Sequence, residues 1–127
     1  MSLRVGMRGE ASLVVGESET AATLGAGGVH VLGTPVMISL MENAAWRLVQ
    51  SELAAGETTV GTVVNVRHLA ATPLGSRVVA TAELIEIDSR RLVFRVSAED
   101  DAGHIGEGVH ERAIVHLERF LDRVSKR

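Results

Sequence analysis

The chain has 127 residues, 46% of them hydrophobic, and a formal net charge of −3 at pH 7. These values are typical of one soluble domain spanning residues 1–127, and the basic excess and stacking aromatics of a nucleic-acid-binding protein are missing. No apolar run reaches the length of a membrane span and no secretion signal is evident, so we expect a cytoplasmic protein that does not enter a membrane. The absence of cysteine excludes disulfides, thiolate metal sites and a cysteine nucleophile.

The first half of the chain predicts one strand, one loop and one long helix. Residues 10–15 (EASLVV) favour a short strand, and the glycines at 25, 27 and 28 favour a loop up to residue 33. Thr34-Pro35 is typical of a helix start with Thr34 as N-cap. Apolar residues then recur with helical spacing as far as Leu53, and Gly56 marks the end of the helix.

After the helix the apolar period changes to two. Strands are predicted over residues 60–70, 77–87, 91–99 and 105–120, with turns between them. In the first of these, the residues of even number, among them Val60, Thr62 and His68, are expected to face the helix. Because a single helix must cover the sheet, we predict an α+β fold in which an antiparallel sheet curls around one central helix.

Glu42 lies where the predicted helix should be apolar. The expected apolar face consists of Met37, Ile38, Met41, Ala44, Ala45, Leu48, Val49 and Leu53. Glu42 projects into the same arc, and a carboxylate there is costly unless it is paired, hydrogen-bonded or used in chemistry. The alternative is a carboxylate that reaches solvent or pairs with an arginine.

His68 and Thr34 are the polar residues expected to share a site with Glu42. A lone histidine on the inner face of a strand is more often a satisfied core residue, but a carboxylate beside an imidazole fixes its tautomer and raises its basicity. A hydroxyl at a helix N-terminus lies near free backbone N–H groups that can hold an oxyanion. The three residues together favour a hydrolytic enzyme.

The remaining polar residues give weaker signals. Gly61 allows a close backbone approach or marks an irregularity of the strand. His110, Arg112 and His116 share one face of the last predicted strand, and that face could meet solvent or another subunit. The histidines lack the spacing of a metal site, and neither a phosphate loop nor a dinucleotide fingerprint is present, so we expect no metal and no cofactor.

Three segments resemble the fluoroacetyl-CoA thioesterase family of small hotdog-fold enzymes: LGTPVMISLMENAAWRLVQ, GTVVNVRHLAATPLG and GEGVHERAIVHLERF. The resemblance implies a hotdog fold and hydrolysis of an acyl-CoA, with CoA as part of the substrate. It maps the family's catalytic set onto Thr34, Glu42 and His68, a helpful backbone N–H onto Gly61, and an arginine near the site onto Arg112. It also implies a homodimer with the acyl-CoA sites at the subunit boundary.

The loop before the helix departs from this family. It reads LGAGGVHVL, whereas the fluoroacetyl-CoA enzyme carries phenylalanines there that form a lid. The resemblance therefore does not support fluoroacetyl selectivity, and we expect a thioesterase for small or short-chain acyl-CoA. The alternatives are a hotdog enoyl-CoA hydratase or dehydratase, in which His68 and Glu42 move a proton next to the carbonyl, and a non-catalytic acyl-CoA-binding module.

Overall fold

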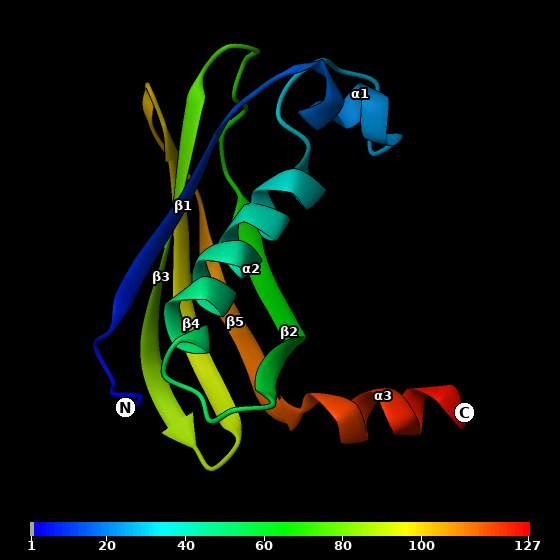
Figure 1. Ribbon diagram of the computed structural model, residues 1–127. Coiled ribbons are helices and arrows are strands. Elements are labelled where there is room, and N and C mark those ends of the chain that lie inside the picture. Colours follow the sequence, from blue (N-terminus) through cyan, green and yellow to red (C-terminus); the bar gives the residue numbers. More distant parts are fainter. Residues whose placement is uncertain (1) are drawn as a thin grey trace.

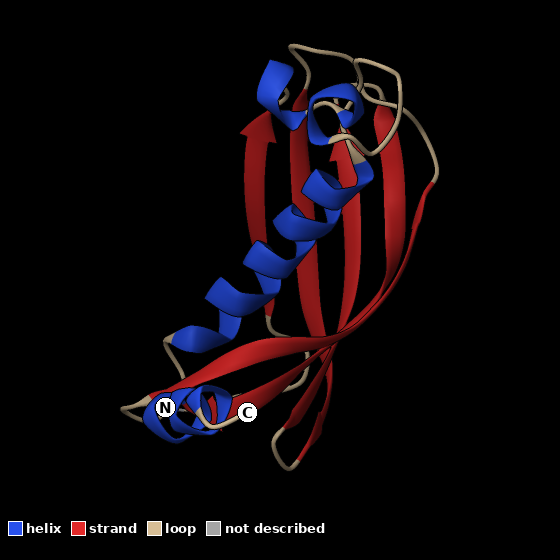
Figure 2. Ribbon diagram, turned by 90° about the vertical axis from the view of Figure 1, so that its right-hand side faces the viewer, coloured by secondary structure: helices blue, strands red, loops and turns tan. Residues whose placement is uncertain are grey.

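A five-stranded antiparallel sheet with one long helix across one face forms the body of the protein (Figures 1 and 2). The computed structural model describes residues 2–127. The sheet has the order β1-β3-β4-β5-β2, where the strands are β1 (Arg8–Val14), β2 (Glu57–His68), β3 (Arg77–Asp88), β4 (Arg91–Asp100) and β5 (Gly103–His116). The helical elements are η1 (Glu17–Glu19), α1 (Ala21–Leu24), α2 (Thr34–Gln50) and α3 (Leu117–Ser125). The predicted α+β fold and its order of strand, long helix and four strands are confirmed.

Helix α2 packs on the sheet through one apolar stripe. Its buried residues are Met37, Leu40, Met41, Ala44, Ala45 and Val49. Small residues on the sheet, such as Ala80 and Ala82, let the helix approach closely. The prediction placed Ile38, Leu48 and Leu53 on this face and omitted Leu40. The stripe is shifted because α2 crosses the sheet diagonally and packs mainly against β1 and β3 (Figure 2).

The start and the end of α2 differ from the prediction. Gly33 is the N-cap, and Thr34 is already the first helical residue. The Thr34 hydroxyl lies 2.7 Å from Nδ1 of His68, so this side chain is engaged across the fold instead of capping the helix. The helix ends at Gln50, three residues before Leu53, and Gly56 adopts a left-handed conformation (φ 83°) in the turn that leads into β2.

Two helices occupy segments that were predicted otherwise. Helix α1 lies in the predicted loop, where the Thr20 hydroxyl accepts a hydrogen bond from the Thr23 N–H and the left-handed Gly25 ends the turn. The last strand ends at His116 rather than residue 120, because the apolar residues that follow have helical spacing and form α3. Among residues 2–127, none of the helices combines the length and the apolar character needed to cross a membrane.

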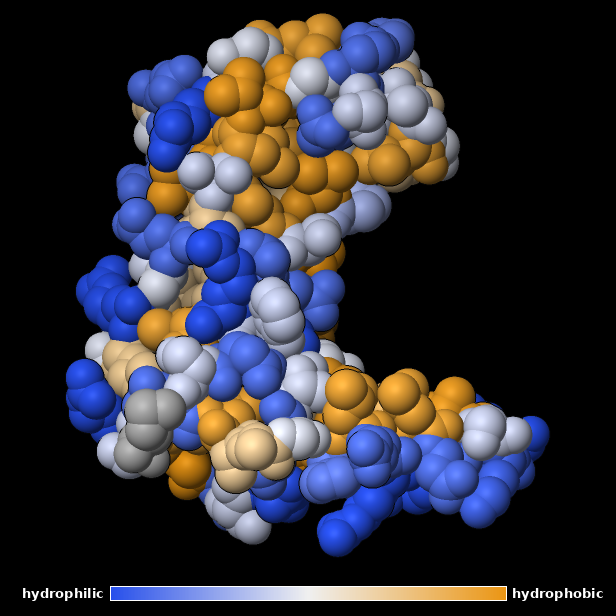
Figure 3. Space-filling model, in the orientation of Figure 1, coloured by the Kyte–Doolittle hydropathy of each residue, from blue (hydrophilic) through white to orange (hydrophobic). Residues whose placement is uncertain are grey.

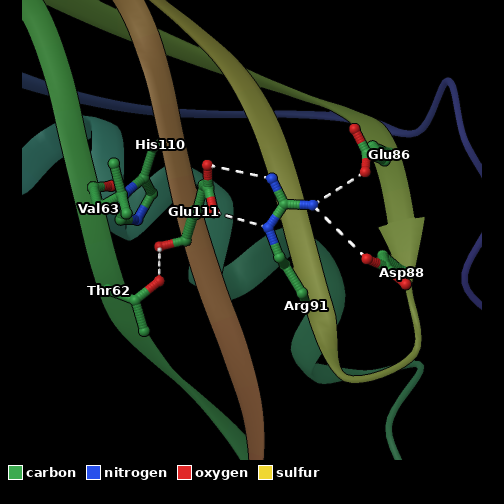
Figure 4. A network of polar contacts seen from close by, with 7 residues as sticks. All are labelled: Thr62, Val63, Glu86, Asp88, Arg91, His110 and Glu111. Carbon is green, nitrogen blue, oxygen red and sulfur yellow. Dashed lines mark hydrogen bonds and ion pairs between the residues drawn. The ribbon is translucent and has the colours of Figure 1, made fainter.

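A β-bulge at Thr62 changes which residues of β2 face the helix. Gly61 pairs with Arg112 and Val63 pairs with Glu111, so Thr62 is the extra residue. Its hydroxyl donates a hydrogen bond to the Glu111 carbonyl at 3.2 Å, as Figure 4 shows. Odd-numbered residues therefore face α2 before the bulge and even-numbered residues after it. The prediction that Val60 and Thr62 face the helix is wrong.

Gly108 offers a test of the close approach between β5 and β2. A Cβ atom at this position would overlap the Asn65 carbonyl and the Val66 backbone, whereas a Cβ at Gly28 would meet nothing within 4 Å. We expect Gly108→Ala to lower the free energy of unfolding by about 1–3 kcal/mol or more, as overpacking does. Gly28→Ala, the matched control, should change it by less than about 0.5 kcal/mol. Urea denaturation of both variants measures the difference, and equal stability would contradict the pairing.

Candidate active site

A buried arginine organises the polar residues between α2, β2 and β5. Arg112 is only 7% exposed, so its charge needs partners for its N–H groups. Its Nε donates to the Thr59 hydroxyl at 2.8 Å, and its Nη2 donates to the Thr59 carbonyl at 3.0 Å. Its Nη1 lies 3.1 Å from Nε2 of His110 and 3.6 Å from Oε2 of Glu42. Both branches of the guanidinium are therefore held in place.

His110 has a defined protonation state in this network. Its Nδ1 lies 2.8 Å from the Val63 carbonyl, which can only accept, so Nδ1 carries the proton. Its Nε2 is then free to accept the hydrogen bond from Arg112. The ring is 1% exposed, and burial lowers the pKa of His110 below its usual value, which favours this neutral form. The carbonyl that fixes this tautomer belongs to Val63, the residue directly after the bulge at Thr62 (Figure 4).

Glu42 lies at the margin of the helix face, directly above Gly61. Its side chain is 40% exposed, and its Oε2 is 3.6 Å from Arg112 and 3.9 Å from Nε2 of His110. A Cβ atom at residue 61 would lie 2.7 Å from the same oxygen. The glycine therefore leaves the room that the carboxylate occupies, and it also stands next to the bulge. Both readings of Gly61 from the sequence apply.

The opposite face of the sheet carries a separate network of charges. Arg91 contacts Glu111 at 2.8 Å and Glu86 at 2.9 Å, with Asp88 at 3.9 Å (Figure 4). Glu111 lies between His110 and Arg112 in β5, so by the alternation of a strand its side chain lies on the opposite face from theirs. These exposed ion pairs hold the two sides of the β3–β4 turn to β5, and they leave the helix side of β5 to the Arg112 network.

Thr34 and His68 form a second polar group at the other end of β2. The Thr34 hydroxyl lies 2.7 Å from Nδ1 of His68. Nε2 of His68 is buried and has no hydrogen-bond partner among the described residues, and burial lowers the pKa of His68. Both residues line a cavity of about 330 Å³ whose other walls are Ala21, Ala26, Gly27, Val29, Val31, Leu32, Leu69, Ala70 and Ala71. An imidazole and a hydroxyl thus face a small apolar pocket.

The five predicted site residues fall into two groups within one chain. Glu42, Gly61 and Arg112 lie together, and Thr34 lies with His68. Gly61 and His68 are seven positions apart in β2, which corresponds to roughly 20 Å along an extended strand. The interaction of Glu42 with His68 expected from the sequence is not among the contacts within this one chain.

His110 and Thr59, which hold the arginine, were not among the predicted site residues. His110 was expected beside Arg112 on one face of the last strand, a face that could meet solvent or another subunit. The face meets α2, and only the packing of the strand against the helix determines this. In residues 2–127, no group of three or more His, Cys, Asp or Glu side chains is placed to hold a metal ion.

Because His110 is buried in its neutral form, we expect the protein to lose stability in mild acid. The pKa of His110 is lower in the folded protein than in the unfolded chain, where it is about 6.5. As the pH falls from about 7 to about 5, the unfolded chain binds a proton that folded His110 resists, so the free energy of unfolding decreases. The pKa of His68 is also lowered by burial, so this residue adds to the decrease in the free energy of unfolding.

Urea denaturation at several pH values measures this decrease. We expect it to be smaller in His110→Gln, which does not titrate and keeps an acceptor for Arg112. The exposed His104→Gln serves as the control and should keep the decrease of the unaltered protein. An equal pH dependence in the His110 variant would contradict a buried neutral imidazole.

Comparisons with known proteins show the family to which this chain belongs. Residues 15–118 match the family of fluoroacetyl-CoA-specific thioesterases. A fluoroacetyl-CoA thioesterase from Streptantibioticus cattleyicolor is 46% identical over 98 residues, which cover 77% of this chain and 70% of that protein.

Solved structures show the same fold. The structure of the fluoroacetyl-CoA thioesterase FlK is 41% identical and has a TM-score of 0.94, covering 100% of this chain and 98% of the other. A thioesterase superfamily member from Thermus thermophilus is 29% identical with a TM-score of 0.89, covering 98% of this chain and 95% of the other. The expected hotdog fold and the expected family are confirmed. The chain belongs to the fluoroacetyl-CoA-specific thioesterase family.

Proposed function

We propose that this protein is an acyl-CoA thioesterase that hydrolyses small or short-chain acyl-CoA to the free acid and CoA. The observation that carries the proposal is the presence of two complementary groups along β2. One group offers a carboxylate held beside a buried arginine, and the other offers a hydroxyl-bonded imidazole that lines an apolar pocket. Together they contain the base, the proton donor and the acyl-binding surface that thioester hydrolysis requires.

Glu42 and His68 divide the proton transfers in this mechanism. Glu42 acts as the base that takes a proton from water as the water attacks the carbonyl carbon, or the carboxylate attacks that carbon itself. In both routes the C–S bond breaks, and the CoA thiolate leaves with a proton from His68. In the second route this cleavage gives a transient anhydride, which water then hydrolyses to the free acid and the carboxylate of Glu42. Thr34, hydrogen-bonded to this imidazole, orients the ring and the attacking group. Water supplies the hydroxyl of the acid and the hydrogen of the thiol, so these side chains suffice without a cofactor.

Arg112 and Gly61 support the reacting carboxylate. The guanidinium is fixed by Thr59 and His110, so it presents its charge to Glu42 without a conformational change. Gly61 leaves space for the carboxylate, and in the proposed mechanism its backbone N–H donates to the oxyanion that develops on the thioester carbonyl. We propose Arg112 and Gly61 as the residues that bind the substrate and stabilise this charge.

The pocket beside Thr34 and His68 indicates the class of acyl group. Apart from Thr34 and His68, the pocket is lined by alanines, valines, leucines and Gly27, and its lining contains no Phe, Tyr or Trp. A pocket of about 330 Å³ with such walls suits a small or short aliphatic acyl group. Fluoroacetyl selectivity is not part of the proposal, because no phenylalanine lines the pocket.

We propose that the active enzyme is a homodimer in which each site uses residues of both subunits. β2 is an edge strand of the sheet, so its outer backbone groups are open to pairing. Antiparallel pairing of β2 with its copy, centred between Val64 and Asn65, sets Gly61 of one subunit opposite His68 of the partner subunit. Glu42 of one subunit would then meet Thr34 and His68 of the partner subunit. We further propose that residues 1–127 act as one unit in the cytoplasm.

The first experiment measures free-thiol release from a panel of acyl-CoA substrates. The panel runs from acetyl to medium-chain acyl groups and includes fluoroacetyl-CoA and phenylacetyl-CoA. We expect release with the small aliphatic members, and a decrease of about 10²–10⁴-fold in Glu42→Gln because the base is lost. Glu99→Gln, an exposed carboxylate on β4, is the matched control and should keep full activity.

The same panel separates the alternative functions, which the family does not favour. Crotonyl-CoA that loses its enoyl absorbance without release of thiol would indicate a hydratase. Thermal stabilisation by acyl-CoA without any turnover would indicate a binding module. A folded Glu42→Gln variant with unchanged thiol release would overturn the assignment of Glu42.

A mixed dimer tests whether the sites are shared. We expect Glu42→Gln and His68→Ala homodimers to be inactive. In the heterodimer of the two variants, one site loses both residues and the other keeps both. Heterodimers purified through two different tags should therefore show about half the activity of the unaltered dimer. A heterodimer as inactive as its parents would place each site within one chain, and a monomer in size-exclusion chromatography with light scattering would exclude the dimer.

A further inference from the structure

Helix α3 projects from the body of the protein with an uncovered apolar face (Figure 1). This α3 face consists of Leu117, Phe120, Leu121 and Val124, which lie on one side of the helix by their spacing. None of the residues of α3 is buried, and Leu121 is 54% exposed. Because a helix of nine residues is marginal in water by itself, it needs a surface on which to pack.

The helix turns its polar side toward its own chain. Arg119 and Arg123 line a polar cavity together with Glu57 and Arg90, which are joined by a 2.8 Å ion pair. The α3 face points the other way, over the hollow in the molecule that Figure 3 shows. The surface that covers the α3 face must therefore come from outside this chain.

A second apolar patch lies on the other side of that hollow. This mouth patch consists of Ala26, Val29, Leu69 and Ala71, all of them exposed and all lining the pocket beside Thr34 and His68. Val29 is 57% exposed and Leu69 is 53% exposed. Figure 3 shows hydrophobic side chains gathered on this part of the surface and again along α3. The pocket is thus open on its apolar side.

The two patches lie at opposite ends of β2. Helix α3 starts beside the beginning of the strand, since the Leu117 N–H donates to the Gly56 carbonyl at 2.9 Å. Leu69, in the mouth patch, directly follows the end of the strand at His68. A two-fold axis that pairs β2 with its copy brings the beginning of one strand next to the end of the other. It therefore brings the α3 face of one copy to the mouth patch of the other, twice per dimer.

We infer that α3 docks on the mouth patch of a second copy of this chain and forms the outer wall of that copy's acyl pocket. The inference rests on the proposed dimer, and it goes further by naming the surface that closes the pocket. Each acyl pocket would then be built from the loop and β2 end of one subunit and from α3 of its partner. The side chains of the α3 face would then limit the size of the acyl group that the pocket accepts.

A cross-link between engineered cysteines tests the docking, because the chain has no cysteine of its own. The protein carrying both Leu121→Cys and Leu69→Cys is treated with a short bismaleimide, and the product is separated by denaturing electrophoresis. We expect a covalent dimer. Each single variant serves as a control, and so does Leu121→Cys combined with Val5→Cys, an exposed position before β1 at the far edge of the sheet. These controls should stay monomeric on the gel.

The outcomes separate the inference from the proposed function. A dimer in light scattering that gives no more cross-link than the Val5 control would overturn the docking and leave the dimer standing. A monomer would overturn both the dimer and the docking. Thiol release by the unaltered protein decides the thioesterase activity independently of either result.

A kinetic comparison tests the role of α3 as a pocket wall. Leu121→Asp places a charge in the α3 face, and we expect it to raise KM for the best acyl-CoA by about tenfold with kcat largely kept. Glu118→Ala on the polar side of the same helix is the matched control and should keep the KM of the unaltered protein. An unchanged KM in a folded, dimeric Leu121→Asp protein would exclude α3 from the pocket.

Discussion

The buried charge of Arg112 is the constraint on which the polar side of this structure depends. A guanidinium removed from water is costly unless its N–H groups are hydrogen-bonded and its charge is matched. Thr59, His110 and Glu42 meet these needs from β2, β5 and α2. Each partner also ties the network to another part of the fold. Thr59 links it to the start of β2, and His110 contacts the Val63 carbonyl beside the bulge. The Glu42 carboxylate lies over Gly61.

The bulge at Thr62 explains how one edge strand serves both groups of polar residues. Gly61 and His68 are seven positions apart, so on a regular strand they would face opposite sides of the sheet. The extra residue reverses the alternation, and both residues come to face α2. β2 lies at the edge of the sheet and has one polar group near Gly61 and the other near His68. Pairing with a symmetric copy would therefore bring the Gly61 group of one subunit to the His68 group of its partner.

The shape of the molecule also agrees with a site shared between two copies of the chain. The long helix crosses the sheet diagonally, while the segment that contains α1 and the helix α3 stand out at the two ends of β2 (Figures 1 and 3). Among residues 2–127 of a single copy, these apolar surfaces are exposed, and the pocket beside His68 is open. The two-fold symmetry that would bring the catalytic groups together would also cover these apolar surfaces. One dimer would therefore both complete the polar site and bury the exposed apolar side chains.

The sequence by itself determined the elements whose periodicity is long and regular. The 3.6-residue spacing along α2 and the alternation in β3 and β4 predicted the main helix, most of the strands and the fold class, since a buried face imposes its period on the residues. Glu42 was found because it interrupts such a pattern. The segment after His116 is short, and its change of period from two to 3.6 was missed.

Only the tertiary structure decided the features that depend on contacts between distant segments. Thr34 precedes a proline as an N-cap would, yet its hydroxyl is used by His68, 34 positions away in the chain. The bulge at Thr62 leaves no local signal that distinguishes it from an ordinary alternation. The role of His110 follows from which face of β5 the helix covers, and periodicity gives the alternation of a strand but not the side that is buried. The separation of Glu42 from His68 is likewise a property of where α2 lies on the sheet.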